Sequence, residues 1–309
     1  MVHGILNVYK EKGYTSHDVV AKLRGIVGQK KIGHTGTLDP DAEGVLPVCL
    51  GKGTKLCEFL TEKEKTYEAV LLLGRTTDTQ DVSGHTLTLK ETGDLSEEAV
   101  IQAVLSFIGT YPQIPPMYSA VKVGGKKLYE LAREGKTIER KPRMVTIRQI
   151  RILKMELPKV RMEVTCSKGT YIRTLCADIG ETLRCGGCME SLLRTRSGIF
   201  TMENSLTLQE IEKKKEDGTL EKDILPVDQV FRQYPAVYVK RSREKAARNG
   251  GELLASDVKG VLEISGQTGN ERNYVRLYDE EGHFIALYEF QEPEKSFSIV
   301  KMFFPERDG

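Results

Sequence analysis

The chain has 309 residues, including 46 Lys or Arg and 44 Asp or Glu, so its formal net charge at pH 7 is only +2. This length predicts one large domain or two, and the near-neutral charge excludes general binding of polyanions through overall charge. The first residues are too short and too soon charged for a secretory leader, and no uncharged apolar run could cross a bilayer. With six cysteines and no leader, we expect a cytoplasmic protein with reduced thiols.

The first third of the chain predicts a helix, a loop and a buried strand. Ser16 can cap a helix, because apolar residues follow it at helical spacing: Val19, Val20, Leu23, Ile26 and Val27. A loop rich in Gly and Pro comes next, and the apolar run Val45–Leu50 reads as a buried segment. Residues Tyr67–Leu73 have the composition of a strand that ends at Gly74.

The middle of the chain predicts two more helices and a pair of strands. A helix begins at Asp94 or Ser96 and ends at Gly109, with an expected core stripe of Val100, Ile101, Val104, Leu105 and Ile108. Met144–Ile152 and Val160–Cys166 alternate like paired strands, and a helix with its apolar residues between Ile172 and Leu183 follows.

Between these elements lies a basic insertion. Proline residues break regular structure at its start, and Lys126–Arg133 reads as a short helix with charge on both faces. Between Met117 and Arg148 there are nine Lys or Arg against three Glu. Such a local excess of positive charge is what the attraction of phosphates requires, although a solvated charged face would have the same composition.

The sharpest boundary follows Pro226. Beyond it, short alternating segments are separated by Gly and Asn, which predicts a small β-barrel. The segments are Ala236–Val239, Gly260–Ile264, Tyr274–Tyr278 and Phe284–Tyr288.

The most informative segment is the loop Gly33–Pro47, with the sequence GHTGTLDPDAEGVLP. Glycines permit unusual backbone conformations, and Pro40 fixes the chain just after Asp39. Such a loop holds one carboxylate in one place. Asp-Pro in a Gly-rich run is by itself only turn chemistry, so the interpretation depends on the whole string.

This loop resembles the catalytic motif of the bacterial tRNA pseudouridine-55 synthases of the TruB type. Other ordered blocks resemble the same family over roughly residues 4 to 200: Lys10–Val20, Lys65–Tyr67 with Gly74–Thr79, Pro115–Lys122, Tyr129–Gly135 and Lys168–Leu175. The resemblance implies an α+β protein, with a mixed, mainly antiparallel sheet flanked by helices and a small C-terminal PUA-like β-barrel. We expect a catalytic domain over 1–230, an RNA-gripping thumb at about 115–143, and an RNA-binding domain over 235–309.

The resemblance also implies the reaction, in which uridine 55 of the tRNA T loop is flipped out and isomerised to pseudouridine. We expect tRNA, through its T stem-loop, as the partner, with no cofactor, no metal, no membrane and no obligate protein partner, and a monomer as the default. The reaction needs a nucleophilic carboxylate, a role we assign to Asp39. Because burial raises the pKa of a carboxyl group, a permanent cation is needed beside it, and the resemblance identifies Arg173.

The remaining site residues are also assigned by resemblance. Tyr67 is expected to stack on the base and to lie where the C5 proton leaves, and Tyr171 and Leu192 to pack against base and sugar. His34 is expected to insert into the T loop, and Asp81 to orient basic groups or the active-site loop. The expected phosphate contacts are Lys122, Lys126, Lys127, Arg133, Arg140, Lys141 and Arg143.

Two local features need separate comment. Leu193 stands where the family usually has an arginine, although Arg194 is retained, so the rim of the pocket is expected to differ. Cys185 and Cys188 form a CxxC pair, which can be a zinc half-site or a redox pair. No second CxxC or paired His supplies other ligands, and the family has a Gly-rich turn here, which we favour.

Three alternatives remain open at this stage. A guide-RNA-dependent relative shares the chemistry but needs partner proteins, and the basic thumb favours the stand-alone type. A non-catalytic RNA-binding or RNA-folding protein would keep the scaffold without needing the Asp39, Tyr67 and Arg173 set. A glycoside hydrolase using Asp39 would need a second carboxylate, for which only Asp41 and Glu43 lie close in sequence.

Overall fold

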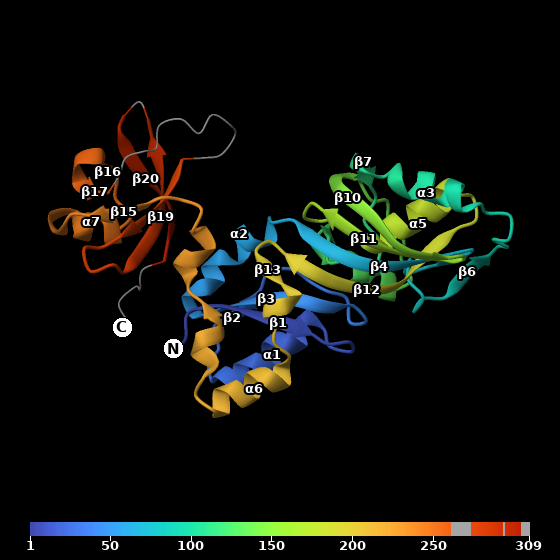
Figure 1. Cartoon of the computed structure of the whole chain (residues 1–309), viewed down its shortest axis with the longest axis horizontal. Coiled ribbons are helices and arrows are strands. Elements are labelled where there is room, and N and C mark those ends of the chain that lie inside the picture. Colours follow the sequence, from blue (N-terminus) through green and yellow to red (C-terminus); the bar gives the residue numbers. More distant parts are fainter. Residues whose placement is uncertain (261–272, 293, 304–309) are drawn as a thin grey trace.

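A computed structural model of the chain describes residues 1–260, 273–292 and 294–303, and Figure 1 shows its arrangement. Within these residues, ten strands form one mixed sheet. In spatial order, eight of them are β14 (Ile224–Leu225), β1 (Gly4–Lys10), β3 (Glu43–Leu50), β12 (Gly187–Ser197), β4 (Lys65–Leu73), β11 (Lys159–Cys166), β10 (Arg143–Glu156) and β7 (Gly109–Gln113). The short strands β2 (Ile32–His34) and β13 (Phe200–Thr201) pair with β3 and β12.

The sheet is antiparallel except where β12 meets β3. There Leu193 pairs with Glu43 and Arg194 with Gly44 in parallel register. This contact joins two halves of the sheet, one around β1 and β3 and one running from β12 to β7. The predicted mixed, mainly antiparallel sheet is therefore confirmed.

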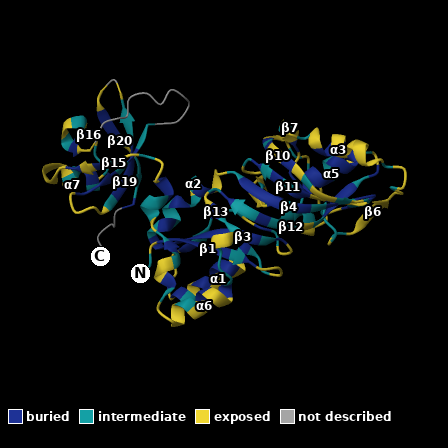
Figure 2. Cartoon of the chain, in the orientation of Figure 1, coloured by how far each residue is buried: buried dark blue, intermediate teal, exposed yellow. Residues whose placement is uncertain are grey.

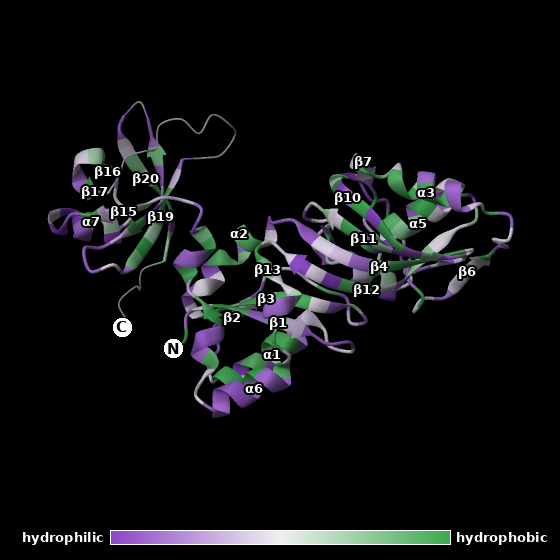
Figure 3. Cartoon of the chain, in the orientation of Figure 1, coloured by the Kyte–Doolittle hydropathy of each residue, from purple (hydrophilic) through white to green (hydrophobic). Residues whose placement is uncertain are grey.

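Helices cover each half of the sheet (Figure 1). Helices α1 (Ser16–Val27) and α6 (Leu208–Glu216) pack on β1 and β3, and α3 (Glu97–Leu105) and α5 (Ile172–Thr182) pack on the other half. Each half of the sheet has its own cluster of buried apolar residues. Figure 2 shows the buried residues following the strands, while exposed residues mark α3 and α6. Figure 3 shows the same division as hydrophobic strands and helix faces beneath hydrophilic outer faces.

The smaller elements form hairpins and short helices around the large sheet. Strands β5 (Arg75–Thr77) and β6 (Thr86–Leu89) pair with each other, as do β8 (Lys122–Val123) and β9 (Lys126–Lys127). Helix α2 (Cys57–Thr61) follows β3, and α4 (Leu128–Arg133) follows β9 within the predicted thumb.

The C-terminal part forms a separate six-stranded, barrel-like sheet within the described residues. Its order is β16 (Leu253–Leu254), β20 (Ser296–Met302), β19 (Phe284–Gln291), β18 (Tyr274–Tyr278), β15 (Ala236–Val239) and β17 (Val258–Lys259), with α7 (Glu244–Arg248) beside it. Its own core includes Val237, Val275 and Tyr288. A further cluster joins this sheet to the large one, because Leu287 and Phe303 pack with Ile5 and Phe231.

Most predicted elements are confirmed, with three differences. The cap of α1 is Thr15, in a capping box with Asp18, whereas the Ser16 hydroxyl is turned to the backbone of Leu38. Helix α3 does start after Ser96, but it ends at Leu105, before the predicted end at Gly109, and its buried stripe is narrower than expected. Val100 and Val104 are buried, whereas Ile101, Leu105 and Ile108 are 38%, 41% and 46% exposed.

The third difference lies in the thumb, where Lys126 and Lys127 belong to β9 and only Leu128–Arg133 is helical. The predicted strand Gly260–Ile264 falls largely outside the described residues. The domain boundaries at 230 and 235 stay a prediction. No helix of the described part is long and apolar enough to span a membrane.

Candidate active site

The loop that carries Asp39 is fixed from two sides. On one side, the Ser16 hydroxyl accepts a hydrogen bond from the Leu38 backbone N–H at 2.9 Å. On the other, the Lys10 ammonium donates to the carbonyls of Pro40 at 3.1 Å and Ala42 at 2.5 Å. The backbone around Asp39 is therefore held by the start of α1 and the end of β1.

Asp39 forms a two-point ion pair with Arg173. Arg173 Nε lies 3.0 Å from Asp39 Oδ2, and Nη2 lies 3.3 Å from Oδ1. The Arg173 side chain is 7% exposed, whereas 40% of the Asp39 side chain remains exposed. The cation is thus buried beneath a carboxylate that a substrate can reach, and the predicted proximity of the two residues is observed.

The pKa of Asp39 reflects a balance. Burial raises the pKa of this carboxyl group, the Arg173 guanidinium lowers it, and the nearby Asp81 carboxylate raises it again. The net direction is upward from the usual value. Without Arg173, burial and Asp81 would together favour the protonated, non-nucleophilic form.

Arg173 also ties three separate segments together. Its Nη1 donates to the Thr79 carbonyl at 3.0 Å and forms an ion pair with Asp81 Oδ2 at 3.6 Å. Its Nη2 donates to the carbonyl of Tyr118, in the thumb, at 2.8 Å. A guanidinium has five N–H donors in a rigid plane, so these contacts together fix its orientation.

Asp81 is itself held in place. Its Oδ1 accepts hydrogen bonds from the Thr79 hydroxyl at 2.8 Å and from the Ser83 backbone N–H at 3.0 Å. Its other oxygen is left to face Arg173. Asp81 thus faces the Arg173 guanidinium, and its role in orienting that group stays a prediction.

Tyr67 is buried beside a residue whose role was not predicted. Tyr67 on β4 pairs in register with Arg194 on β12, and Arg194 is only 1% exposed. Burial raises the pKa of the Tyr67 phenol, while Arg194 lowers it. Arg194 Nε donates to the Val45 carbonyl at 2.6 Å and Nη2 to the Gly36 carbonyl at 3.3 Å, so it also holds both ends of the Asp39 loop.

The other predicted pocket residues lie on elements that adjoin Tyr67, Arg173 or the Asp39 loop. Leu192 packs against the same hydrophobic core as Tyr67, and Tyr171 immediately precedes α5, which carries Arg173. His34 lies at the start of the loop, half-buried, with its ring edge-on to His17 at 5.2 Å between centroids. Burial is the main cause that lowers the pKa of His34 to about 4, so the ring is neutral at pH 7.

The predicted phosphate contacts differ in exposure. Exposed side chains on the thumb and its edges are Lys122, Lys126, Arg133, Lys141 and Arg143. Lys127 and Arg140 are half-buried instead. Arg140 Nη1 donates to the Pro115 carbonyl at 3.1 Å, which holds the two ends of the thumb together.

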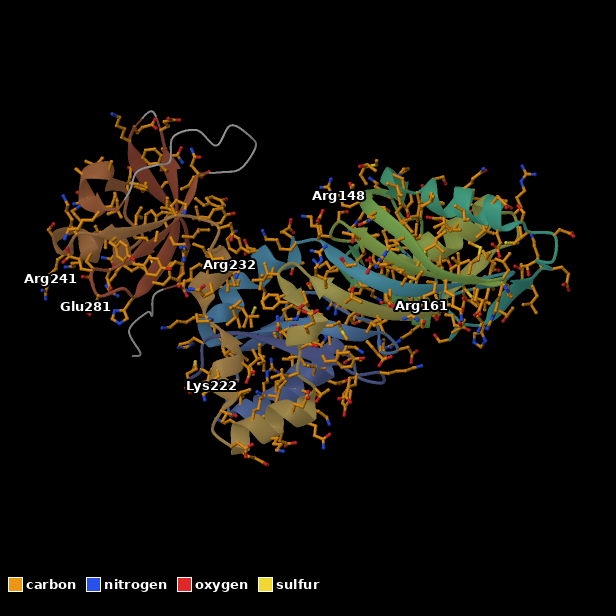
Figure 4. The ribbon with its side chains drawn as sticks, viewed as in Figure 1. Arg148, Arg161, Lys222, Arg232, Arg241 and Glu281 are labelled. Carbon is orange, nitrogen blue, oxygen red and sulfur yellow. The ribbon has the colours of Figure 1, made fainter. Side chains whose placement is uncertain are left out.

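Residues that could bind a metal gather away from this site. Among the described residues, Asp279, Glu281 and His283 place their donor atoms within 4.8 Å of one another. Figure 4 shows Glu281, in the turn between β18 and β19 of the C-terminal part, far from Arg148 and Arg161 of the large sheet. The Asp279 carboxylate already accepts from the backbone N–H groups of Glu281 and His283 and pairs with Arg248, so it closes a turn with protein donors.

The CxxC segment forms a tight turn next to α5. The Cys185 thiol points at the carbonyls of Gly180 and Gly186, and both cysteines of the pair are buried. Gly186 has φ +79°, in the region that favours glycine.

Three contributors to the site were not singled out from the sequence. Lys10 was assigned only to a family block, Arg194 was noted only as a retained residue, and Gln113 was not considered. Each is a buried polar side chain at the end of, or within, a strand. A charged or amide residue inside an otherwise apolar strand is the signal that could have identified them, because such groups are seldom buried without a partner.

Comparison with known proteins gives two matching family models. Residues 24–172 match the N-terminal domain of the TruB family pseudouridylate synthases, and residues 173–232 match the C-terminal domain of tRNA pseudouridylate synthase B. Together the two models include Asp39, Tyr67 and Arg173.

Curated relatives match over nearly their whole length. The chain is 54% identical over 310 residues to the tRNA pseudouridine synthase B of Lachnoclostridium phytofermentans, covering 98% of this chain and 100% of that one. It is 42% identical over 301 residues to the enzyme of the same name from Bacillus subtilis, covering 96% and 95%.

Solved structures add a similar fold in larger assemblies. A chain in a Cbf5–Nop10–Gar1 complex has a TM-score of 0.73 and 29% identity, with 98% of this chain and 85% of that chain covered. A chain in an H/ACA ribonucleoprotein bound to a substrate RNA containing 2′-deoxyuridine has a TM-score of 0.72 and 28% identity, covering 99% and 86%. From the family models and the full-length relatives, the chain belongs to the TruB family of pseudouridylate synthases.

Proposed function

We propose that this enzyme converts uridine 55 in the T loop of tRNA to pseudouridine, with Asp39 as the nucleophile. The observation that carries the proposal is the reachable Asp39 carboxylate above the buried Arg173 guanidinium. The full-length relatives named tRNA pseudouridine synthase B support tRNA as the substrate.

The reaction is an isomerisation that leaves the composition of the RNA unchanged. The N1–C1′ bond of uridine breaks, a C5–C1′ bond forms, the C5 proton leaves and N1 gains a proton. Asp39 supplies the nucleophile for the bond-breaking stage, and Arg173 keeps it ionised and oriented. No other reactant is needed to balance these steps.

Tyr67 and the residues around it form the binding site for the uracil base while it rotates. The ring of Tyr67 offers an apolar face for stacking, and Leu192 belongs to the same wall. Because burial raises the pKa of Tyr67, the phenol stays neutral at pH 7. A neutral phenol favours the expected stacking of Tyr67 on the base. We place its hydroxyl on the path by which the C5 proton leaves.

The target uridine is stacked in folded tRNA, so it must be flipped out before Asp39 can reach it. The neutral ring of His34, at the start of the same loop, is suited to stack in the vacated space, because it brings no charge that would have to be desolvated. The exposed cations of the thumb supply attraction for the RNA backbone.

We further propose that the enzyme works on tRNA as a monomer in the cytoplasm, without guide RNA or partner proteins. The basic thumb between residues 115 and 143 supports this, because it gives the chain its own surface for RNA. A guide-dependent enzyme and a non-catalytic tRNA-binding protein are the alternatives that experiment must separate.

The test uses purified protein and an unmodified tRNA transcript labelled with tritium at C5 of its uridines. We expect release of one tritium per tRNA without any added cofactor or guide RNA, and no release when uridine 55 is replaced by cytidine. Release that persists from the cytidine transcript would contradict the choice of position. Tight binding without any release would instead favour one of the two alternatives.

A further inference from the structure

Gln113 is a buried amide that holds the residue before α5. It is the last residue of β7 and only 2% exposed. Its Oε1 accepts a hydrogen bond from the Tyr171 backbone N–H at 2.8 Å, and its Nε2 donates to the Tyr171 carbonyl at 3.1 Å. One side chain therefore satisfies both backbone polar groups of Tyr171.

A second side chain fixes the orientation of this amide. Gln113 Nε2 donates its other hydrogen to the Tyr111 hydroxyl at 2.6 Å. Since only the NH₂ end can donate twice, the amide cannot be reversed without losing these bonds. The Tyr111 ring is in turn held edge-on by Phe107, at 5.3 Å between centroids, and its hydroxyl interacts with Asp178 of α5.

The amide acts at the point where α5 begins. Tyr171 is the N-cap residue of α5 and has no side-chain cap, and its carbonyl also accepts the first helical hydrogen bond, from Leu175 N–H at 3.0 Å. Arg173 lies two residues later, in the first turn. A change in the direction of the chain at Tyr171 would therefore move the guanidinium that pairs with Asp39.

The same segment is tied to Arg173 at a second point. Gln113 directly precedes the thumb, and five residues later the Tyr118 carbonyl accepts from Arg173 Nη2 at 2.8 Å. The chain from Gln113 to Tyr118 therefore runs between two contacts with the same short stretch, Tyr171–Arg173. Gln113 fixes the backbone of that stretch and Tyr118 its guanidinium.

We propose that Gln113, oriented by Tyr111, is a positioning residue that sets Tyr171 and Arg173 for the reaction at Asp39. The proposal rests on the function proposed above. The backbone of Gln113 pairs with Arg143 in the sheet, but the hydrogen bonds of its side chain go to Tyr171 and Tyr111. We therefore assign the contribution of this side chain to the chemical step and not to RNA affinity. Small displacements of a catalytic group lower the rate by large factors. A buried side chain that fixes Tyr171, two residues before Arg173, should therefore affect the reaction.

The main variant is Gln113→Met, which keeps the length and burial of the side chain but removes all three hydrogen bonds. Under single-turnover conditions we expect the rate constant for tritium release to fall about 10- to 100-fold. The Kd for tRNA should stay within about twofold of the parent, because the phosphate contacts are unchanged. The matched control is Gln149→Met, at an exposed position of β10, which should leave both values within about twofold.

A second pair of variants separates positioning from general loss of stability. Tyr111→Phe removes only the hydroxyl and should lower the rate constant about threefold. The double variant with Gln113→Met should be no slower than Gln113→Met alone, because both changes act through one chain of hydrogen bonds. All rates are measured well below the melting temperature of each variant, so a merely structural role would not change them.

Hydrogen exchange at the start of α5 gives a readout that does not depend on activity. Gln113→Met should remove the protection of the Tyr171 amide while protection in β4 persists. A rate constant within twofold of the parent, or equal losses in rate and affinity, would overturn the proposal even if the melting temperature fell. If the parent released no tritium, the proposed function would fail. Unchanged protection of the Tyr171 amide in Gln113→Met would overturn the positioning role of Gln113 independently of activity.

Discussion

Arg173 and Asp39 meet through two nitrogen–oxygen contacts of 3.0 and 3.3 Å, although they lie 134 residues apart in the chain. The guanidinium belongs to α5, on one half of the large sheet, and the carboxylate to the loop before β3, on the other half. The centre of the site therefore depends on how the two halves are joined. The pairing with Arg173 lowers the pKa of the Asp39 carboxyl group against the effect of burial and leaves the carboxylate accessible.

Replacing Arg173 by Lys should separate the effect of charge from that of geometry. Lysine keeps the positive charge but has no planar fork, so it cannot bind both oxygens of Asp39 and the carbonyls of Thr79 and Tyr118 together. We expect the single-turnover rate constant to fall about 100-fold with little change in tRNA affinity. Arg151→Lys, on the exposed face of β10, is the matched control, and a loss in Arg173→Lys no larger than in this control would show that charge alone suffices.

We expect the rate constant to fall at alkaline pH because Lys10 loses its proton. Burial is the main cause that lowers the pKa of Lys10 to about 8, with Glu43 and Asp39 opposing the shift and Arg194 adding to it. Its ammonium donates to three backbone carbonyls around the Asp39 loop. As the pH rises through about 8 the proton is lost, and a neutral amine has only two N–H donors for these carbonyls.

We therefore expect the rate constant to fall as the pH rises through about 8, and Lys10→Met to give a flat profile about tenfold lower. Lys65, whose pKa burial also lowers to about 8, donates to Thr61 and Lys63 instead, so Lys65→Met should keep the alkaline fall. Single-turnover rates between pH 6 and 9.5 distinguish the two. An alkaline fall that survives in Lys10→Met would assign it to another group.

The junction between the two halves of the sheet should be sensitive at Gly44. This glycine has φ +107°, and a Cβ added there would lie 2.3 Å from the Arg194 carbonyl oxygen of β12. Gly44→Ala should lower the free energy of unfolding by about 2–4 kcal/mol, because both the backbone conformation and the parallel contact with β12 are lost.

Gly25 supplies the control for this change. It is an exposed residue inside α1 with no atom within 4 Å of an added Cβ. Gly25→Ala should raise the free energy of unfolding by about 0.5–1 kcal/mol, since alanine favours the helix. Urea titrations of the two variants should move in opposite directions, and equal stability of Gly44→Ala and the parent would refute the tight junction.

The thumb should contribute affinity that depends on salt. Reversing two exposed cations, in the double variant Lys122→Glu and Lys141→Glu, should raise KM and reduce the slope of log Kd against log salt by about one per lost phosphate contact. The value of kcat should stay close to that of the parent. The control reverses Lys213 and Lys222 near α6, and Figure 4 shows Lys222 far from Arg148 on β10; equal slopes in both double variants would remove the thumb from RNA binding.

The spacing of apolar residues was sufficient to predict most individual helices and strands, but not their boundaries or buried faces. The alternating runs of β4, β10 and β11 and the apolar spacing of α1 and α5 were predicted because each element buries one regular face. The buried stripe of α3 was predicted too wide, since apolar spacing alone does not show which of these residues stay exposed. Thr15 and Ser16 are both good caps, and only the position of Leu38 explains why the first one caps the helix.

The site shows a similar division. Asp39 and Arg173 were identified through resemblance to a family, because no local pattern connects residues on two different halves of a sheet. Lys10, Gln113 and Arg194 were missed because their role depends on burial among carbonyls from distant segments. For Arg194 that role follows from the parallel contact with Gly44, which no short-range signal in the sequence specifies.

The most direct test compares tritium release by Asp39→Asn and Asp41→Asn with the parent, under single-turnover conditions on the same tRNA. Asp41 is an exposed carboxylate two residues away, so it controls for charge in the loop. We predict that Asp39→Asn binds tRNA but releases no tritium, while Asp41→Asn stays within about threefold of the parent. Release by Asp39→Asn at a rate similar to that of Asp41→Asn would contradict the assignment of the nucleophile.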